Sequence, residues 1–369
     1  MIRILHALSG GHIGGTERMV DRLVRGLNAS AFHSEISVLD ESGATSAHLA
    51  KSGFPVHHLD GRRGHIGAVR RFVAVLQAGR YDIVHLYGFR VSLLGRLAAR
   101  LCRTPPKVIH GIRGLHVTEG MHTDALRTQA ALRIERLLSG LIDLYVTNSA
   151  GAVDFLVSAG LPAAKFHVIP NGIEPDVWCP SPDRSPQAVP VVVTVANFRP
   201  IKRLCDLIDA LALVRQATVP FRAVLIGDGP LRGELQARID HHGLGDRVAL
   251  EGQLTPDRIR RELDNADVFV LPSLWEGMPV SVMEAMSMAV PVVGTDVPGI
   301  RELVVTDETG LLVPSSAPAS LATAMTRLLR DRDVARAMGV AGRVRIVRCF
   351  SLNRMVDAHT AVYGSLVNA

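Results

Sequence analysis

The chain has 369 residues, more than one hydrophobic core usually serves, so we expect two domains of under about 200 residues each. Hydrophobic residues make up 47% and charged residues 21% of the chain, which is ordinary for a folded α/β protein and argues against extensive disorder. No apolar run approaches the roughly 18 to 20 residues that cross a bilayer, so we expect a cytoplasmic protein.

The positive charge is concentrated in the first half of the chain. Up to Trp178 there are 20 Lys and Arg residues against 14 Asp and Glu residues, so the first half holds the whole formal excess of +6. This asymmetry predicts an anionic partner, such as the inner face of the cytoplasmic membrane, a lipid phosphate or an acidic glycan. A solvated basic surface is the alternative. Nucleic acid is not expected, because aromatic residues make up only 4% of the chain.

Short β-branched runs alternate with helical patterns along the first half. Between the runs, apolar residues recur at helical spacing, as from Met19 to Leu27, where Thr16 is placed to cap the first turn. Such alternation predicts a parallel sheet covered by helices, as in a Rossmann-like domain. The predicted strands are residues 2–8, 35–39, 83–86, 108–109, 144–147 and 168–169.

The sequence changes character between Trp178 and Pro190, where four prolines break any regular element, and we place the domain linker there. The alternation then restarts, which predicts a second doubly wound domain. We therefore expect an N-terminal domain of residues 1–178, a C-terminal domain of residues 179–350, and a ligand cleft between them at the carboxyl ends of the strands. The second set of predicted strands is residues 191–195, 223–226, 248–250, 268–271, 290–293 and 311–313.

The last segment, residues 351–369, is predicted to be a helix. Met355, Ala358, Val362 and Leu366 lie on one helical face, so this helix needs a surface to cover. Its sequence alone does not identify that surface.

The strongest chemical signal is the segment PSLWEGMPVSVMEAM, which follows a predicted buried strand. Gly277 and Pro279 mark the turn into a helix, whose first amides, near Met278 to Val280, would point at an anion such as a diphosphate. Glu276 could face a transferred sugar, and Glu284, seven residues further on, could accept hydrogen bonds from ribose hydroxyls. Two surface carboxylates on a helix are the alternative.

Two cations follow the first strand of the second half. Arg199 and Lys202, in ANFRPIKR, could stabilise a leaving phosphate together with the helix amides. An exposed basic turn is the alternative. No Asp-x-Asp cluster suggests bound Mg²⁺, and the four cysteines are too widely separated to indicate a zinc site, so no metal or cofactor is predicted.

Glycine loops and one histidine complete the set of candidates. Gly14 and Gly15, in GGHIGG, would let the backbone approach a phosphate or an acceptor, but the spacing is not that of a dinucleotide-binding loop. Gly227, in GDGP, would do the same for the nucleotide, with a tight turn as the alternative. His110 ends a predicted strand and would project into the cleft. Weaker candidates near strand ends are His6, His12 and His85.

Taken together, several segments of the chain resemble glycosyltransferase family 4, a group with the GT-B fold of two Rossmann-like domains. The resemblance covers nearly the whole chain and implies that Glu276 and Glu284 contact the donor sugar and its ribose. It also implies that Arg199 and Lys202 bind the diphosphate. The segments are GGTERMV, VIHG, PNGIEPDVW, NFRPIKR, GDGPLRGEL and SLWEGMPVSVMEAMSMAVPVVGTDVPGIRELV.

The same resemblance implies that His110, Gly14 and Gly15 lie by the reacting sugar, and that the C-terminal helix crosses back onto the first domain. Family members retain the anomeric configuration and need no divalent metal. A mechanism in which the donor phosphate assists deprotonation of the acceptor is commonly proposed for them.

The predicted function is therefore transfer of a hexosyl unit from a nucleotide diphosphate sugar to a glycan or lipid-linked acceptor. The opening motif and the segment YGFRVSLLGRLAARL are similar to transferases of bacterial exopolysaccharide, lipopolysaccharide or glycolipid synthesis. Two alternatives share the fold class: a sugar-nucleotide epimerase, and a protein that binds nucleotide sugars without catalysis.

Overall fold

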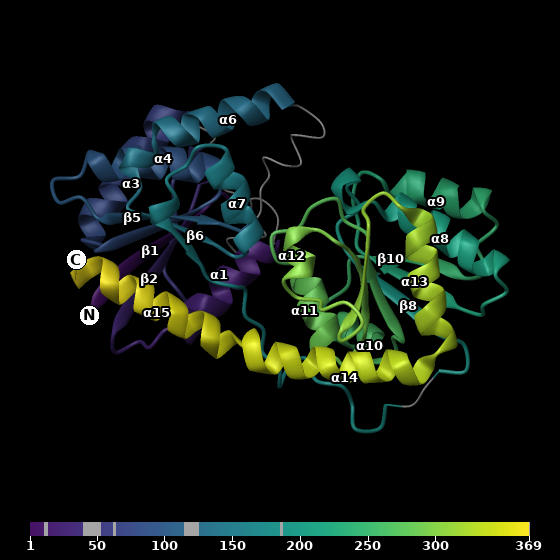
Figure 1. The fold of residues 1–369 in the computed structure, drawn as a ribbon. Helices are drawn as coiled ribbons and strands as arrows, with labels where there is room; N and C mark the ends of the chain where they lie inside the picture. Colours follow the sequence, from purple (N-terminus) through teal and green to yellow (C-terminus); the bar gives the residue numbers. More distant parts are fainter. Residues whose placement is uncertain (11–13, 40–52, 62–63, 114–124, 185–186, 369) are drawn as a thin grey trace. The chain divides into compact units, whose positions relative to one another are not determined.

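The computed structural model describes residues 1–10, 14–39, 53–61, 64–113, 125–184 and 187–368 (Figure 1). These residues form two compact units. Unit 1 comprises Met1–Gly172 together with Leu352–Ala369, and unit 2 comprises Ile173–Ser351. The division thus falls between Gly172 and Ile173, before the expected linker.

Unit 1 contains a seven-stranded sheet in the order β3-β2-β1-β4-β5-β6-β7, and all of its strand pairs are parallel. β3 was not predicted, because a three-residue strand with two histidines lacks the β-branched signal on which the sequence analysis relied. The strands are β1 (Ile2–Leu8), β2 (Phe32–Val38), β3 (Val56–His58), β4 (Ile83–Tyr87), β5 (Lys107–Ile112), β6 (Leu144–Thr147) and β7 (Phe166–Val168).

Helices cover both faces of this sheet. One face carries α3 (His65–Gly79), α4 (Phe89–Arg100) and α6 (Ala125–Leu137), and the other carries α1 (Gly15–Gly26) and α15 (Leu352–Asn368), as Figure 1 shows. The remaining helices of unit 1 are α7 (Ala150–Ser158) and the short 3-10 turns η2 (Ser139–Leu141) and η3 (Ala163–Lys165).

The first turn of α1 is capped differently from the prediction. Gly14 occupies the N-cap position, and Thr16 lies inside the helix. The Glu17 carboxylate accepts a hydrogen bond from the Gly14 amide at 2.9 Å. A glutamate three residues after the cap can reach back to the cap amide, and this contact fixes where the helix starts.

The C-terminal helix α15 belongs to unit 1, where it packs against α1 and β1. Its buried face includes His359 and Tyr363 in addition to the apolar residues Met355 and Val362. The Tyr363 hydroxyl lies 2.8 Å from Nδ1 of His85 in the middle of β4. Polar aromatic residues therefore hold this helix in place, a contribution that hydrophobic spacing alone did not reveal.

Unit 2 contains a six-stranded parallel sheet in the order β10-β9-β8-β11-β12-β13. Its strands are β8 (Val191–Val195), β9 (Arg222–Ile226), β10 (Val248–Gly252), β11 (Val268–Leu271), β12 (Val292–Thr295) and β13 (Gly310–Val313). Its helices are η4 (Pro200–Lys202), α8 (Leu204–Gln216), α9 (Arg232–His241), α10 (Pro256–Asp264), α11 (Val280–Ser287), α12 (Pro298–Arg301), α13 (Pro318–Arg330) and α14 (Arg332–Cys349).

Two apolar cores fill the two faces of this sheet. Val192 of β8 points into the core beneath α8, α9 and α13, whereas Val191 and Val193 point into the core beneath α10 and α11. Trp178 is buried in the second core, and Ser181 hydrogen-bonds Asp264 of α10. The proline-rich segment expected as a linker is therefore attached to unit 2 by side-chain contacts that prolines do not prevent.

Both sheets reverse their strand order once, between β1 and β4 in unit 1 and between β8 and β11 in unit 2. At such a point the loops after two neighbouring strands turn to opposite faces, which opens a crevice at the carboxyl edge of the sheet. In unit 2 the loop after β8 carries Arg199 and Lys202, and the loop after β11 carries Glu276. The sequence-predicted residues thus follow the two strands that flank the reversal.

Candidate functional site at the carboxyl edges of the sheets

In unit 2, the two predicted groups contact each other directly. Lys202 Nζ donates to Glu276 Oε1 at 2.5 Å, and the Ser273 hydroxyl donates to the same oxygen at 2.6 Å. The lysine side chain is 22% exposed and the glutamate side chain 9% exposed, so the pair sits at the border between interior and solvent. Two residues 74 positions apart in sequence therefore form one polar site.

The loops that carry this pair are joined through their backbones. The Leu274 amide donates to the Ile201 carbonyl at 2.8 Å, and the Thr295 hydroxyl donates to the Ser273 carbonyl at 2.5 Å. The first bond fixes the separation of the loops after β8 and β11, and the second ties the loop after β11 to the end of β12. A site held on such connected loops needs little reorganisation when a ligand binds.

Gly227 supports the loop that carries Arg199. Its φ of 138° suits glycine, and a Cβ there would lie 1.9 Å from the Ala196 carbonyl oxygen. At Gly229, with φ of 159°, a Cβ would lie 2.6 Å from the carbonyl oxygen of Phe198, whose amide donates to the Asp228 carbonyl at 2.9 Å. The glycines of GDGP therefore pack two loops together, and contact of Gly227 with a nucleotide stays a prediction.

The start of α11 is shaped by a second close backbone approach. A Cβ on Gly299, in α12, would lie 2.1 Å from the Gly277 carbonyl oxygen, so only glycine fits against this turn. Helix α11 begins at Val280 with Pro279 as its N-cap. Because proline has no N–H, the amides that can point at an anion are those of the first helical turn.

Glu284 and Arg199 complete the predicted donor site. Glu284 lies on α11 and is 4% exposed, which agrees with a carboxylate facing the protein interior more than bulk solvent. Arg199 is the exposed N-cap of η4 and precedes Lys202 by one turn. The structure thus places both cations on the same short turn after β8.

In unit 1, Gly14 and Gly15 begin α1 after the central strand β1. The Gly14 amide is occupied by Glu17, whereas an added Cβ on Gly15 would meet no atom of the described residues within 4 Å. Gly15 is therefore the better placed of the two for close approach of a ligand. His12 lies outside the described residues.

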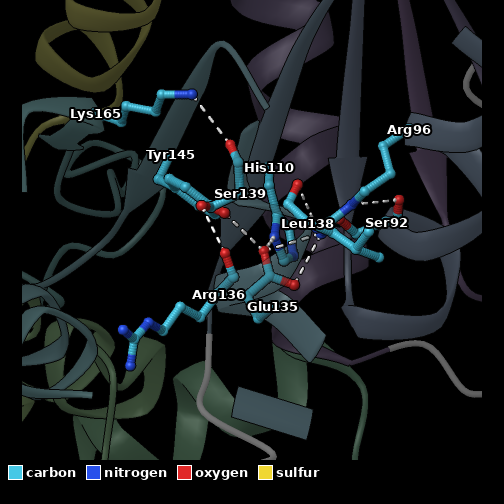
Figure 2. A network of polar contacts seen from close by, with 9 residues as sticks. All are labelled: Ser92, Arg96, His110, Glu135, Arg136, Leu138, Ser139, Tyr145 and Lys165. Carbon is cyan, nitrogen blue, oxygen red and sulfur yellow. Dashed lines mark hydrogen bonds and ion pairs between the residues drawn. The ribbon is translucent and has the colours of Figure 1, made fainter. Parts of the chain in front are cut away.

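His110 does not project from the edge of the sheet as predicted. It is 4% exposed, and its Nδ1 lies 3.1 Å from Oε1 of Glu135 on α6 (Figure 2). The reason is register: His110 pairs with Leu86 of β4, so its side chain points to the face covered by α4 and α6. A direct contact of His110 with substrate stays a prediction, and the structure shows it in an internal network.

That network is centred on Glu135. Its carboxylate accepts hydrogen bonds from Arg96 at 2.9 and 2.8 Å and from the Tyr145 hydroxyl at 2.9 Å (Figure 2). Arg96 is fully buried, and its charge is balanced by this single carboxylate. Burial alone would raise the pKa of Glu135, but His110 and Arg96 outweigh burial and lower it to about 2.

A second polar cluster, which sequence analysis missed as a unit, lies on the opposite face of the same sheet. The Tyr87 hydroxyl lies 3.2 Å from His6 Nδ1 and 3.0 Å from His85 Nδ1. Arg113, the first residue after β5, reaches His359 of α15 at 3.0 Å. The signal available in the sequence was the alternate spacing of His85 and Tyr87, which puts both on one face of a strand.

Two family models match the chain. One, described as glycosyl transferase 4-like domain, matches residues 14–172, and the other, described as glycosyl transferases group 1, matches residues 189–331. A GDP-mannose-dependent α-(1-6)-phosphatidylinositol monomannoside mannosyltransferase of Mycobacterium tuberculosis is 31% identical over 290 residues, which cover 74% of this chain and 73% of the relative. The chain is a group 1 glycosyltransferase.

Another bacterial relative of this glycosyltransferase is named for galactose transfer. An Escherichia coli protein named UDP-Gal:α-D-GlcNAc-diphosphoundecaprenol α-1,3-galactosyltransferase is 28% identical over 307 residues, covering 79% of this chain and 78% of that protein. Among solved structures, HepE of Anabaena in complex with UDP-glucose superimposes with a TM-score of 0.87 at 21% identity, over 99% of this chain and all of HepE. The fold of the glycosyltransferase is GT-B.

Two further observations concern the described residues alone. Among them, no three His, Cys, Asp or Glu side chains are grouped so that they could hold a metal ion. Also among them, no helix combines the length and the apolar character needed to span a bilayer.

The buried pair of Arg96 and Glu135 predicts how the stability of unit 1 depends on pH. Replacing Glu135 by Gln leaves the Arg96 charge unpaired, so we expect unfolding at neutral pH to become easier by about 3 to 5 kcal/mol. Because the folded pKa of Glu135 lies below its ordinary value of 4.5, the wild-type advantage should shrink as pH falls from about 4.5 toward 2.

Urea unfolding of the glycosyltransferase, read by pulsed hydrogen exchange of peptides from β5 and α6, measures this in unit 1 alone. Asp154→Asn is the control, because Asp154 is an exposed carboxylate of the same unit on α7. An equal loss in both variants, or a Glu135→Gln deficit that does not change with pH, would contradict the prediction.

Proposed function

We propose that this glycosyltransferase moves a hexosyl unit from a nucleotide diphosphate sugar to a glycan or lipid-linked acceptor, with retention of configuration and without a metal. The observation that carries the proposal is the contact of Lys202 with Glu276 at the strand-order reversal of unit 2. It sets a cation and a carboxylate side by side where open α/β sheets bind their ligands.

The cations of this site suit the leaving group. Departure of a nucleoside diphosphate concentrates negative charge on its phosphate oxygens, and positioned cations and amides stabilise that charge. Lys202 and Arg199 supply positive charge from one turn, and the first amides of α11 supply N–H donors with the helix dipole behind them. These groups together would hold the diphosphate.

The carboxylates of this site suit the sugar and the ribose. Glu276 already accepts hydrogen bonds from Lys202 and Ser273, which fix its orientation next to the cation. In the proposal, Glu276 accepts hydrogen bonds from hydroxyls of the transferred sugar while Lys202 turns toward the phosphate. Glu284, in the second turn of α11, accepts hydrogen bonds from the ribose hydroxyls. The donor phosphate assists deprotonation of the acceptor.

The relatives support the class of donor and acceptor. HepE was solved with UDP-glucose, and the Escherichia coli relative is named for a galactosyl donor and a lipid diphosphate acceptor. On this basis we place the chain in synthesis of bacterial exopolysaccharide, lipopolysaccharide or glycolipid, with unit 1 as the acceptor side. A sugar-nucleotide epimerase would instead isomerise the donor when no acceptor is present.

We further propose that one face of unit 1 docks on an anionic membrane. Helices α3, α4 and α6 bury some apolar side chains and expose others, among them Leu126 at 80% and Leu137 at 82% on α6, and the α4 C-cap Leu101 is 64% exposed. Glu135 is the sole acidic residue of these three helices, and it is buried. Apolar side chains amid arginines suit an interface of anionic lipid headgroups. The exposed arginines of α4 and α6 include Arg100, Arg127, Arg133 and Arg136.

Removal of either partner of the central contact tests the donor site. We expect Lys202→Ala and Glu276→Gln each to reduce sugar transfer at least about a hundredfold while the fold is kept, the scale of one lost electrostatic contact in a transition state. Turnover is measured with the nucleotide sugar that raises the melting temperature most in a screen of donors.

The matched controls are Lys107→Ala, at the amino end of β5, and Glu251→Gln, an exposed residue of β10. Both should transfer at the wild-type rate. Near-normal turnover in the Lys202 or Glu276 variant would remove the proposed donor site.

The chemistry of transfer is tested in one reaction with two readouts. We expect transfer to continue at an unchanged rate with excess chelator, because cations of the protein replace a metal at the diphosphate. Nuclear magnetic resonance of the product should show the anomeric configuration of the donor. A chelator-sensitive rate, restored by added Mg²⁺, would contradict metal independence, and an inverted product would contradict retention.

Membrane docking is tested by vesicle sedimentation. We expect the wild type to bind vesicles that contain phosphatidylglycerol and to stay in solution with pure phosphatidylcholine. The double variant Leu126→Ser, Leu137→Ser should lose most of this binding, whereas Val340→Ser, Val344→Ser, which changes two exposed valines of α14, should keep it. Equal binding to both vesicle types would refute the docking surface.

A further inference from the structure

Arg113 stands at the carboxyl edge of the sheet in unit 1. It is the first residue after β5, and β5 lies next to β4, one of the two strands that flank the reversal of strand order. Its guanidinium is held on two sides: Nη1 donates to Asn171 Oδ1 at 2.9 Å, and Nη2 donates to His359 Nε2 at 3.0 Å. The head group therefore has a fixed orientation where α/β sheets bind ligands.

Among the described residues, the hydrogen-bond partners of Arg113 carry no charge. His359 accepts from Arg113 through Nε2, and its Nδ1 lies 2.8 Å from the Met355 carbonyl, so its remaining proton is on Nδ1. Burial and the Arg113 charge lower the pKa of His359 to about 3, and the same two causes lower the pKa of His6 to about 3. Among the described residues, no carboxylate forms an ion pair with Arg113.

Within the part of the chain that the structure describes, several buried polar atoms around Arg113 lack a hydrogen-bond partner. They include Arg113 Nε, Asn148 Oδ1 and His85 Nε2. Asn148 is part of the same cluster, because its Nδ2 donates to the Arg113 carbonyl at 3.1 Å. Buried groups without partners are costly and rare, and their concentration in one place indicates that a ligand satisfies them.

Arg96 provides an internal comparison within the same unit. It is buried on the opposite face of the sheet, and Glu135 balances its charge through both carboxylate oxygens. On the Arg113 face, the described residues provide hydrogen-bond acceptors without a countercharge. A partly buried guanidinium in this condition destabilises the empty protein and favours an anion that enters from outside.

We propose that Arg113 is the oxyanion-binding residue of the acceptor site, with Asn148 as a neighbouring acceptor for a sugar hydroxyl. This inference rests on the proposed function, which assigns the donor diphosphate to unit 2. The oxyanion is carried by the acceptor, either as the diphosphate of a lipid carrier or as the carboxylate of a uronic acid. The planar guanidinium fork binds either group through paired N–H donors.

Calorimetric titration of the full chain at saturating UDP tests the proposal, because UDP then occupies the donor clamp of unit 2. The probes are geranyl diphosphate for the lipid carrier and methyl glucuronide for the uronic acid. We expect one of them to bind with one site per chain, and Arg113→Gln to weaken that binding at least about tenfold, the scale of a lost charged hydrogen bond.

Two further variants make the result specific. Arg113→Lys keeps the charge but loses the fork, so it should bind more weakly than wild type and more tightly than Arg113→Gln. Arg345→Gln is the matched control, since Arg345 of unit 2 donates to the carbonyl of Leu303 at 2.8 Å and should leave binding unchanged. Lys202→Ala should lose sugar transfer yet keep probe binding, which separates failure of the donor site from failure of this site.

The melting temperature without ligand gives a readout that a purely structural role would not produce. Because no carboxylate in the described part of the chain balances the Arg113 charge, Arg113→Gln should melt at the wild-type temperature or above it, and should gain less from the bound probe. Absence of probe binding to wild type at saturating UDP would overturn the proposal. Unchanged binding in Arg113→Gln would also overturn it, and so would a melting temperature of that variant below that of the wild type.

Discussion

The donor site depends on one constraint of topology. In unit 2 the strands β8, β9 and β10 extend the sheet in one direction, and the chain then returns to place β11 on the other side of β8. Loops separated by more than 70 residues thereby become neighbours, and Lys202 meets Glu276 at 2.5 Å. The other features of this site, including the glycines that allow the loops to pack closely, keep the contact between Lys202 and Glu276 fixed.

Unit 1 holds two arginines in contrasting surroundings, Arg96 fully buried and Arg113 partly buried. Arg96 meets the Glu135 carboxylate in the interior, and the pair belongs to the framework between sheet and helices. Arg113 follows the last residue of β5, and its hydrogen-bond partners among the described residues are neutral. Burying a charge costs free energy, so a charge without a countercharge is expected where function needs it. The comparison of Arg96 with Arg113 therefore separates a structural charge from a functional one within one domain.

Much of the fold could be predicted from sequence because its strands are dense β-branched runs. β1, β6, β8 and β11 have the predicted bounds, since apolar runs between helices leave little choice. The face of the sheet to which a side chain points, and its contacts with residues distant in sequence, were harder to predict. His110 was predicted to project from a strand end into the cleft, whereas it contacts Glu135 inside unit 1, because its register with Leu86 is a property of the sheet. The roles of His359 and Tyr363 depend on where α15 returns, which no local pattern contains.

Gly299 shows how a residue can be restricted without ever touching a ligand. Its Cα faces the Gly277 carbonyl so closely that a methyl group would displace the turn bearing Glu276. Evolution would therefore retain this glycine for steric reasons alone, and a comparison of relatives would mark it as strongly as the carboxylate it supports. If binding were inferred from sequence conservation alone, Gly299 would be assigned wrongly to the binding site. The backbone geometry shows instead that its role is structural.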